Sequence, residues 1–542
     1  MNVHPRSLAV PLFLVYVIGV LALAAQPLRT MMQPGYQGIL YKGGDESQYI
    51  MRIGQAMQHP FSDVSNAITS GTKGLQMTFL ESTIGTLLGW TGLSAPFLTI
   101  LLACLIAPLI IPFFALLALR FGVPRRWAVV GGALCFFLLL GPLRRVVHQS
   151  WSLPLVTLTL LLIVDWWKNP SLARSAGLGI ILGIMPGVYF WAWTYTWAVF
   201  GFVVILMCAA DLRRHRLRSV IDRFTQGVIA GVTALVVASP FLFLMWGNAH
   251  HPDGAETSIR SSLIHARELE SLPRSLLLTF FVLFSTLSIG FQPDRRRLLP
   301  LFAMILALFA VLHQQFVHGL VLSFWTHYYP YVCIVSLLFI LVSLASSHRT
   351  VLTAVASILA ATFLFAAFQD YHGRFAIFSP MPRHEKYQHI ASALRALNLT
   401  QETQVVLSDL DVSLIVGTYT HHDLLYTEYL RHVLMSSPEL ARRYCLTQHV
   451  TGRPADTDWL AYNVQELSAA GVPATLAKVE RDREMTKKEC ADVYAHPKDV
   501  LTEYGVTLLL WDEKNYPDWK IPASLFTVSE KGAGWSIWKV RR

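Results

Sequence analysis

Charged residues are scarce in this sequence. Asp, Glu, Lys and Arg make up 14% of the 542 residues, whereas hydrophobic residues make up 54%. A soluble domain carries roughly 25% charged residues, so this chain lacks the polar surface that a water-soluble protein needs. The composition excludes an ordinary soluble protein and predicts a chain that crosses a membrane several times.

Cysteine is also scarce, and no familiar metal-binding spacing occurs. The six cysteines form no CxxC pattern, and no HExxH is present. Four of them lie in apolar runs, where the role of a small hydrophobic side chain is expected. Cys445 and Cys490 lie in the polar C-terminal part, and the sequence leaves open whether they form a disulfide, which requires that part to be outside the cytoplasm.

The formal net charge of +10 does not indicate nucleic-acid binding. Most of the excess lies in short connections between apolar runs, and no basic patch has interleaved aromatic residues. Short basic connections are typical of the cytoplasmic side of membrane proteins. We therefore expect membrane lipids, and no nucleic acid, as partners.

About eleven apolar runs are long enough for membrane spans. The first, 8–25, is longer than the apolar part of a signal peptide and is expected to be an uncleaved anchor. The others lie at 94–119, 127–142, 152–166, 175–191, 194–210, 226–247, 275–291, 298–313, 329–345 and 351–368. The predicted fold class is a polytopic α-helical membrane protein with about 11 transmembrane helices and a C-terminal α/β domain.

The charges in the connections predict which side each one faces. With a cytoplasmic N-terminus, five alternate connections are all short and basic. They contain Arg120, Arg125 and Arg126; Lys168 and Arg174; five arginines between Arg213 and Arg223; Arg295, Arg296 and Arg297; and His348 and Arg349. The longer connections on the other side are nearly balanced. The positive-inside rule then predicts a multi-pass plasma (inner) membrane protein whose loop 26–93 and C-terminal part lie outside the cytoplasm.

Two domains are expected. Residues 1–372 form the transmembrane domain, with helices of the outward loop 26–93 lying on the membrane surface, for example at 75–90. Near residue 373 the composition changes to that of a soluble domain, which runs to 542. Its sequence pattern predicts a helix at 387–397 and strands at 404–407, 414–416, 506–511 and 535–540.

The first outward loop carries two adjacent carboxylates. Asp45 and Glu46 follow two glycines, and Tyr49 and Arg52 come shortly after them. Taken alone, an acidic pair in a polar loop is usually only solvated. The other outward loops therefore decide whether this pair has a chemical role.

Those loops add basic and aromatic residues. Arg144, Arg145 and His148 lie in the second one, and His327 and Tyr328 lie at the start of a late span. Arginines outside run against the charge bias, which favours phosphate binding, although contact with lipid headgroups gives the same pattern. A histidine at a helix entrance is more often interfacial than catalytic, and the aromatic stretch 189–197 is read as an interfacial belt.

Carboxylates and arginines on one side of a membrane suit sugar transfer from a lipid phosphate. The guanidinium of arginine donates two parallel hydrogen bonds to a phosphate, and it stabilises the charge of a departing phosphate. A carboxylate accepts the proton of the attacking hydroxyl, and the sugar passes through an oxocarbenium-like state. The hypothesis is transfer from a polyprenyl-phosphate sugar donor to a lipid, glycan or protein of the cell envelope.

The layout resembles the GT-C superfamily of integral membrane glycosyltransferases, which includes protein O-mannosyltransferases and aminoarabinose transferases. The resemblance is carried by Asp45-Glu46 with Tyr49, by Arg145-x-x-His148-Gln149, and by His327-Tyr328-Tyr329-Pro330. It implies that Asp45 is the catalytic base, that Glu46 is its partner or a ligand of a metal or acceptor, and that Arg145 binds the donor phosphate. His327 is implied to line the same cavity. No cofactor is certain, and a need for a divalent cation stays open.

Two other functions remain alternatives. A transporter or flippase usually carries ionisable groups at mid-membrane and shows paired repeats. Here Asp165 and Asp211 lie near span ends and no repeat is visible, which argues against ion coupling. A non-enzymatic membrane assembly factor is the second alternative, and the sequence does not exclude it.

Overall fold

A computed structural model gives the fold. It describes residues 6–41, 44–60, 79–145, 147–254, 256–257, 264–265, 272–292, 295–314, 316, 320–321, 324–346, 350–370, 381, 385–427, 430, 433–457 and 473–541. The chain forms two compact units. The helical unit comprises Met1–Gln26, Ile100–Phe243 and His265–Phe378, and the mixed unit comprises Pro27–Thr99, Leu244–Ile264 and Ser379–Arg542. The predicted division at 372/373 stays a prediction, and the contacts assign the first outward loop to the mixed unit.

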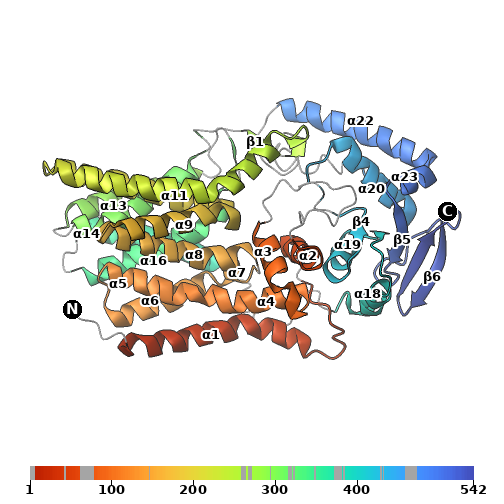
Figure 1. Cartoon of the computed structure of the whole chain (residues 1–542), viewed down its shortest axis with the longest axis horizontal. Helices are drawn as coiled ribbons and strands as arrows, with labels where there is room; N and C mark the ends of the chain where they lie inside the picture. Colours follow the sequence, from red (N-terminus) through yellow and green to blue (C-terminus); the bar gives the residue numbers. More distant parts are fainter. Residues whose placement is uncertain are drawn as a thin grey trace. The chain divides into compact units, whose positions relative to one another are not determined.

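Long apolar helices account for most of the helical unit (Figure 1). The helices lying wholly or partly in it are α1 (Arg6–Met31), α4 (Ala95–Ile106), α5 (Ile110–Arg120), α6 (Arg125–Leu138), α7 (Leu140–Leu143), α8 (His148–Lys168), α9 (Leu172–Val188), α10 (Phe190–Leu212), α11 (Leu217–Ala249), α13 (Leu272–Gly290), α14 (Arg295–Leu312), α16 (Phe324–Ala345) and α17 (Val351–Asp370). The 3-10 turn η2 (Ala107–Leu109) joins α4 to α5, and the two-residue strands are β1 (Ile264–His265) and β2 (Leu320–Val321).

Each apolar run expected to span coincides with a helix or a pair of helices in this series. Among the described residues, seven helices are long and apolar enough to cross a membrane. The polytopic α-helical class is therefore confirmed, whereas the count of about eleven spans stays a prediction.

The basic connections gather at one end of the helical unit, which we call the basic end. Arg120 Nε lies 2.6 Å from Asp165 Oδ1, and Lys168 Nζ donates to the Arg120 carbonyl at 2.9 Å. Asp211, wholly buried, pairs with Arg223 at 3.0 Å and with Arg296 at 3.1 Å. Four of the five basic connections predicted to share one side thus meet through these contacts and through Arg297, whose guanidinium lies against Gly122. His348 and Arg349 of the fifth lie outside the described residues.

The mixed unit is built on a five-stranded sheet with the order β4-β3-β5-β7-β6. Its strands are β3 (Val405–Leu407), β4 (Asp423–Leu424), β5 (Val506–Trp511), β6 (Phe526–Gly532) and β7 (Trp535–Val540). Strand β3 pairs in parallel with β4 and β5, and β7 pairs antiparallel with β5 and β6. The predicted α/β character of the C-terminal part is therefore confirmed.

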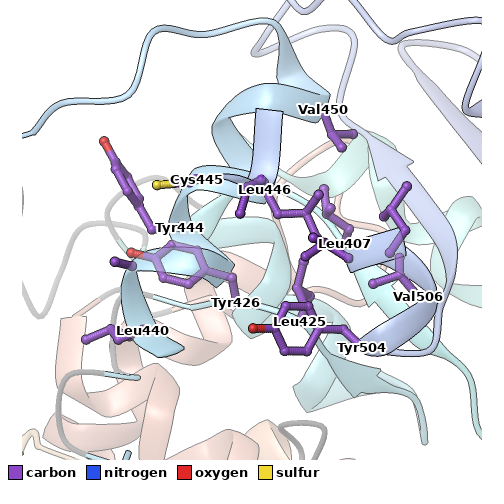
Figure 2. Packing of buried hydrophobic residues seen from close by; sticks show 14 of the residues in the cluster. Leu407, Leu425, Tyr426, Leu440, Tyr444, Cys445, Leu446, Val450, Tyr504 and Val506 are labelled. Atoms are coloured by element: carbon purple, nitrogen blue, oxygen red, sulfur yellow. The ribbon is translucent and has the colours of Figure 1, made fainter. Parts of the chain in front are cut away.

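Helices cover both faces of this sheet. The helices of the mixed unit are α2 (Gly44–Gln58), α3 (Phe79–Leu88), η1 (Gly89–Thr91), η4 (Gln388–Ile390), α18 (Ala391–Leu397), α19 (Leu410–Tyr419), α20 (Ser437–Thr451), α22 (Pro473–Ala495) and α23 (Pro497–Glu503). Helices α18 and α19 pack on one face of the sheet, and α20, α22 and α23 pack on the other. Alternate residues of a strand face opposite sides, and here they enter two separate cores. Leu509 packs with residues of α20, several of which Figure 2 labels, and with Val500 and Leu501 of α23. Leu508 and Leu510 pack with residues of α18 and α19.

Two local expectations are corrected, and one strand was not predicted. The acidic pair lies in helix α2 and not in a loop. Residues 414–416 lie in α19 and not in a strand, because the carboxylate of Asp409 accepts hydrogen bonds from the amides of Asp411 and Val412 and begins a helix there. Strand β6 went unpredicted because five of its seven residues are exposed and lack an apolar alternation. The surface helix expected from 75 begins, among the described residues, at Phe79.

Cys445 of α20 and Cys490 of α22 form a disulfide. This bond settles the pairing that the sequence left open. It joins two helices that cover the same face of the sheet, and it closes a separation of 45 residues. A closed loop of this length restricts the unfolded chain and stabilises the folded one by about 2–4 kcal/mol.

We predict that the double variant Cys445→Ser with Cys490→Ser lowers the free energy of unfolding of the mixed unit by about 2–4 kcal/mol. The measurement is denaturant unfolding of the full chain in detergent, followed by tryptophan fluorescence. Cys208→Ser is the control, because Cys208 is a free cysteine of the helical unit. Equal stability of the double variant and wild type would contradict the prediction.

Candidate functional site

Two of the predicted site residues, His148 and His327, meet around Tyr189, which lies between α9 and α10. The Tyr189 hydroxyl is 2.8 Å from His327 Nδ1. The His148 ring lies 5.4 Å from the Tyr189 ring, and His148 Nδ1 is 3.2 Å from the carbonyl oxygen of Val188. Because a carbonyl oxygen only accepts, Nδ1 of His148 carries the hydrogen. Two histidines that are 179 positions apart are thus brought to one end of the helical unit.

An aromatic and polar framework holds these rings in place. The Trp191 ring stacks on His327 with centroids 4.5 Å apart and planes 9° apart. The hydroxyl of Tyr328, wholly buried, lies 2.6 Å from Thr194 Oγ1 and accepts from Gln314 Nε2 at 2.9 Å. Buried polar groups keep a fixed position when they are hydrogen-bonded, so these two bonds fix the Tyr328 hydroxyl.

The two predicted arginines lie in the connection between α7 and α8. Arg144 donates to the side-chain oxygen of Gln26 at the end of α1, and Arg145 is half-buried within electrostatic range of His327. We call Arg145, His148, Tyr189, Trp191, His327 and Tyr328 the His327 cluster. It combines a permanent cation, imidazole and hydroxyl groups and aromatic faces, which together suit a phosphate and a sugar ring.

Sequence reasoning found four members of the His327 cluster and missed Tyr189 and Trp191. Both fall in an aromatic stretch that resembles an ordinary interfacial belt. Only the pairing of α10 with α16 shows that two of these aromatic residues contact His327 and Tyr328. No signal in the linear sequence indicates that pairing.

The acidic pair begins helix α2 in the mixed unit. Asp45 lies in the first turn, although its side chain and Gly43 are outside the described residues, and Glu46 is half-buried. A carboxylate in the first turn is stabilised by the positive end of the helix dipole. The acidic pair therefore lies at the positive end of the dipole of α2.

Arg52, predicted to bind substrate, contacts a protein partner. Its Nη1 lies 3.4 Å from Glu81 Oε1 of α3, and the two side chains are 3% and 0% exposed. The guanidinium also lies 5.8 Å from the centroid of the Tyr49 ring. Removing one partner of a buried ion pair is strongly destabilising, so this pair fixes α2 against α3. The substrate-binding roles of Arg52 and Tyr49 stay predictions.

The side chains of Gln388 and Tyr419 hold the chain that leads into α2. Gln388 accepts from the amide of Gln37 at 2.7 Å and donates to the carbonyl of Ile39 at 2.7 Å. The Tyr419 hydroxyl accepts from the amide of Leu40 at 2.7 Å. These side chains satisfy backbone groups that would otherwise be buried without partners.

Helix α19 and the residue that follows it hold α2 itself. Gln55 Nε2 donates to the Gly417 carbonyl at 3.3 Å, and Gln58 Nε2 donates to the Thr420 carbonyl at 3.1 Å. Met51 packs so closely against Gly417 that a Cβ there would lie 2.8 Å from its sulfur. The acidic pair is therefore positioned by the C-terminal part of the chain.

Among the described residues, no group of three or more His, Cys, Asp or Glu side chains could hold a metal ion. The side chain of Asp45 lies outside those residues. A divalent cation at the acidic pair therefore stays open, as it was from the sequence.

The residue that begins α19 titrates near neutral pH. Burial, with the nearby carboxylates of Asp411 and Asp512, raises the pKa of Asp409 to about 7, although the two amide donors of α19 lower it. The usual value is 3.8. Between these values the folded state binds a proton that the unfolded state has released, so stability falls as the pH rises from 3.8 to about 7.

We predict that Asp409→Asn removes this pH dependence and keeps the helix start, because Asn caps helices as well as Asp does. The difference in free energy of unfolding between variant and wild type should grow by as much as about 1.4 kcal/mol per pH unit between about pH 4 and pH 7. Denaturant unfolding of the full chain across this range measures it. A difference that is independent of pH would show that Asp409 is not protonated in the folded state.

No protein-family model matches the chain, and no curated protein matches it. Among solved structures, the chain is similar to ArnT from Cupriavidus metallidurans bound to undecaprenyl phosphate, with 13% identity, a TM-score of 0.43, and coverage of 97% of each chain. It is also similar to ArnT from Cupriavidus metallidurans in the apo state, with 13% identity, a TM-score of 0.42, and coverage of 96% of this chain and 97% of that one.

Proposed function

We propose that this protein transfers a sugar from a polyprenyl-phosphate donor to an acceptor of the cell envelope, on the extracytoplasmic side of the membrane. The observation that carries the proposal is the His327 cluster. It gathers a cation, two histidines and two buried aromatic side chains where α8, α10 and α16 begin. The same α8 ends at Lys168, in the basic end, about 30 Å away at 1.5 Å per residue.

Two independent features support the extracytoplasmic side of the membrane as the place of the reaction. The basic end collects the positive charges that face the cytoplasm in most membrane proteins. In the mixed unit, which contains Asp45, Cys445 and Cys490 form a disulfide. Disulfides persist in oxidising compartments and are rare in the cytoplasm. The first feature favours an extracytoplasmic His327 cluster, and the second favours an extracytoplasmic acidic pair.

In the proposed reaction, a hydroxyl of the acceptor attacks the anomeric carbon of the donor sugar. The bond from that carbon to the phosphate oxygen breaks, and the polyprenyl phosphate leaves with the electron pair. Asp45 accepts the hydroxyl proton, and Glu46 orients it or the acceptor. Arg145 balances the charge on the leaving phosphate, while His148 and His327 position its oxygens.

Ion-coupled transport has less support from the described residues. Asp165 and Asp211 are paired with arginines at the ends of helices. Coupling sites of transporters usually lie near the bilayer midplane. Flipping of a lipid-linked substrate without coupling is the alternative that the activity assay must separate.

We predict that Asp45→Asn and Arg145→Ala each lower the rate of sugar transfer by about 100-fold or more, because each removes a group that acts on the transition state. The assay uses membranes supplied with a polyprenyl-phosphate sugar labelled in the sugar. Arg218→Ala is the control, since it removes an exposed arginine of the basic end. Wild-type rates in both variants would refute the site, and movement of the labelled lipid without transfer would favour a flippase.

The orientation has a separate test. We expect a membrane-impermeant maleimide to label Lys514→Cys in intact cells and to label Arg216→Cys only after permeabilisation. Both side chains are exposed, one in the mixed unit and one at the basic end. A Cys208→Ser background removes the one free cysteine that is not buried. The reverse pattern would place the proposed site in the cytoplasm and end the proposal.

A further inference from the structure

A polar cavity of about 190 Å³ lies at the basic end, among the ends of α5 and α8 and the start of α9. It is lined by Arg120, Asp165, Lys168, Asn169 and Arg174. It belongs to the end of the helical unit away from the His327 cluster. None of its residues has a role in the proposed reaction.

The cavity has an excess of positive charge. Three cations and one carboxylate line it, which gives a formal charge of +2. Asp165 is matched by Arg120 in a two-point pair, with Nε to Oδ1 at 2.6 Å and Nη2 to Oδ2 at 3.0 Å. The excess therefore comes from Lys168 and Arg174.

Backbone contacts hold these two side chains near the cavity. Lys168 Nζ donates to the carbonyl of Arg120 at 2.9 Å, and Arg174 Nη1 donates to the carbonyl of Asn169 at 3.0 Å. Each bond uses one N–H group of a side chain that has three or five of them. Carbonyl partners fix the position of a cation and leave its charge in place. Such an arrangement suits an anion with several acceptor oxygens.

The position of the cavity along the helices places it at the level of the membrane surface. Arg120 and Lys168 are the last residues of two candidate spans. Trp127, 49% exposed, follows the next turn of the chain after Arg120. Tryptophan concentrates at the level of the lipid headgroups. A cation at this level therefore meets lipid phosphate more often than it meets a soluble anion.

We propose that this cavity binds the phosphate of an anionic phospholipid headgroup. Lys168 and Arg174 contact the phosphate oxygens, and the ion pair of Arg120 with Asp165 forms the wall. The lipid stabilises the ends of α5, α8 and α9 against each other. We propose a lipid and not a soluble anion as the ligand, because the cavity lies at the end of two candidate spans.

The test measures binding of phosphatidylglycerol and of phosphatidylcholine with the same acyl chains to the full-length protein in detergent, by native mass spectrometry. Wild type should bind phosphatidylglycerol more tightly. Lys168→Gln with Arg174→Gln should weaken that binding about 30-fold, since two cations near an anionic headgroup contribute about 2 kcal/mol in total. Arg216→Gln with Arg218→Gln is the matched control, because it removes two exposed arginines of the basic end outside the cavity.

Equal affinity of wild type for the two lipids would overturn the proposal. An equal loss of affinity for phosphatidylglycerol in the cavity variant and in the control would also overturn it. Inorganic phosphate that displaces phosphatidylglycerol at millimolar concentration would show a site for free phosphate and would also overturn it. A measurement on wild type avoids any folding defect of the variants. In nanodiscs, phosphatidylglycerol should protect Lys168 from an amine-reactive reagent at least threefold more than phosphatidylcholine does, and equal modification would contradict the proposal.

Discussion

The helix that carries the acidic pair depends on hydrogen bonds to residues far along the chain. The amide of Gln37 and the carbonyl of Ile39 both bond to the side chain of Gln388, which is 351 and 349 positions away. A buried backbone group without a partner costs about 1–3 kcal/mol. The chain before α2 therefore adopts this path only when the C-terminal sheet and its helices are folded.

This dependence changes the role expected of the C-terminal residues. By composition they form a separate soluble domain with no evident task. In the structure they supply Gly417 of α19 and Thr420, which follows α19, and the carbonyls of both accept from glutamines of α2. Helix α3 holds the opposite side through the buried pair of Arg52 and Glu81. A carboxylate that must accept a proton in a defined direction gains from such fixation, because misplacement by about 1 Å is costly for catalysis.

The sequence predicts the parts of this protein that follow from composition and local pattern. Apolar runs locate the helices, and clustered arginines identify connections that share one end, as the contacts of Asp211 with Arg223 and Arg296 show. The apolar pattern alone fails where a cap a few residues away decides the secondary structure. Residues 414–416 read as a strand because all three are apolar and two of them, Ile415 and Val416, are β-branched, but the cap at Asp409 makes them helical.

The site shows the same division. Asp45 and Arg145 stand out because charge is rare in this sequence, whereas Tyr189 and Trp191 do not stand out in a stretch rich in aromatic residues. Their importance lies in what they contact, His327 above all. Gln388 gave no signal either, because an isolated glutamine is an ordinary surface residue until the backbone groups that it bonds are known.

The ion pairs at the basic end also influence the position of the aromatic side chains at the other end of the helical unit. Helix α10 starts beside Tyr189 and ends beside Asp211, and its 23 residues span about 35 Å. Asp211 is wholly buried and is held by Arg223 of α11 and Arg296 of α14. Such a pair resists displacement, because a buried carboxylate that loses its partner is strongly destabilised. A helix fixed along its axis at one end cannot slide at the other, so the ion pairs at Asp211 help to keep Trp191 in register with His327.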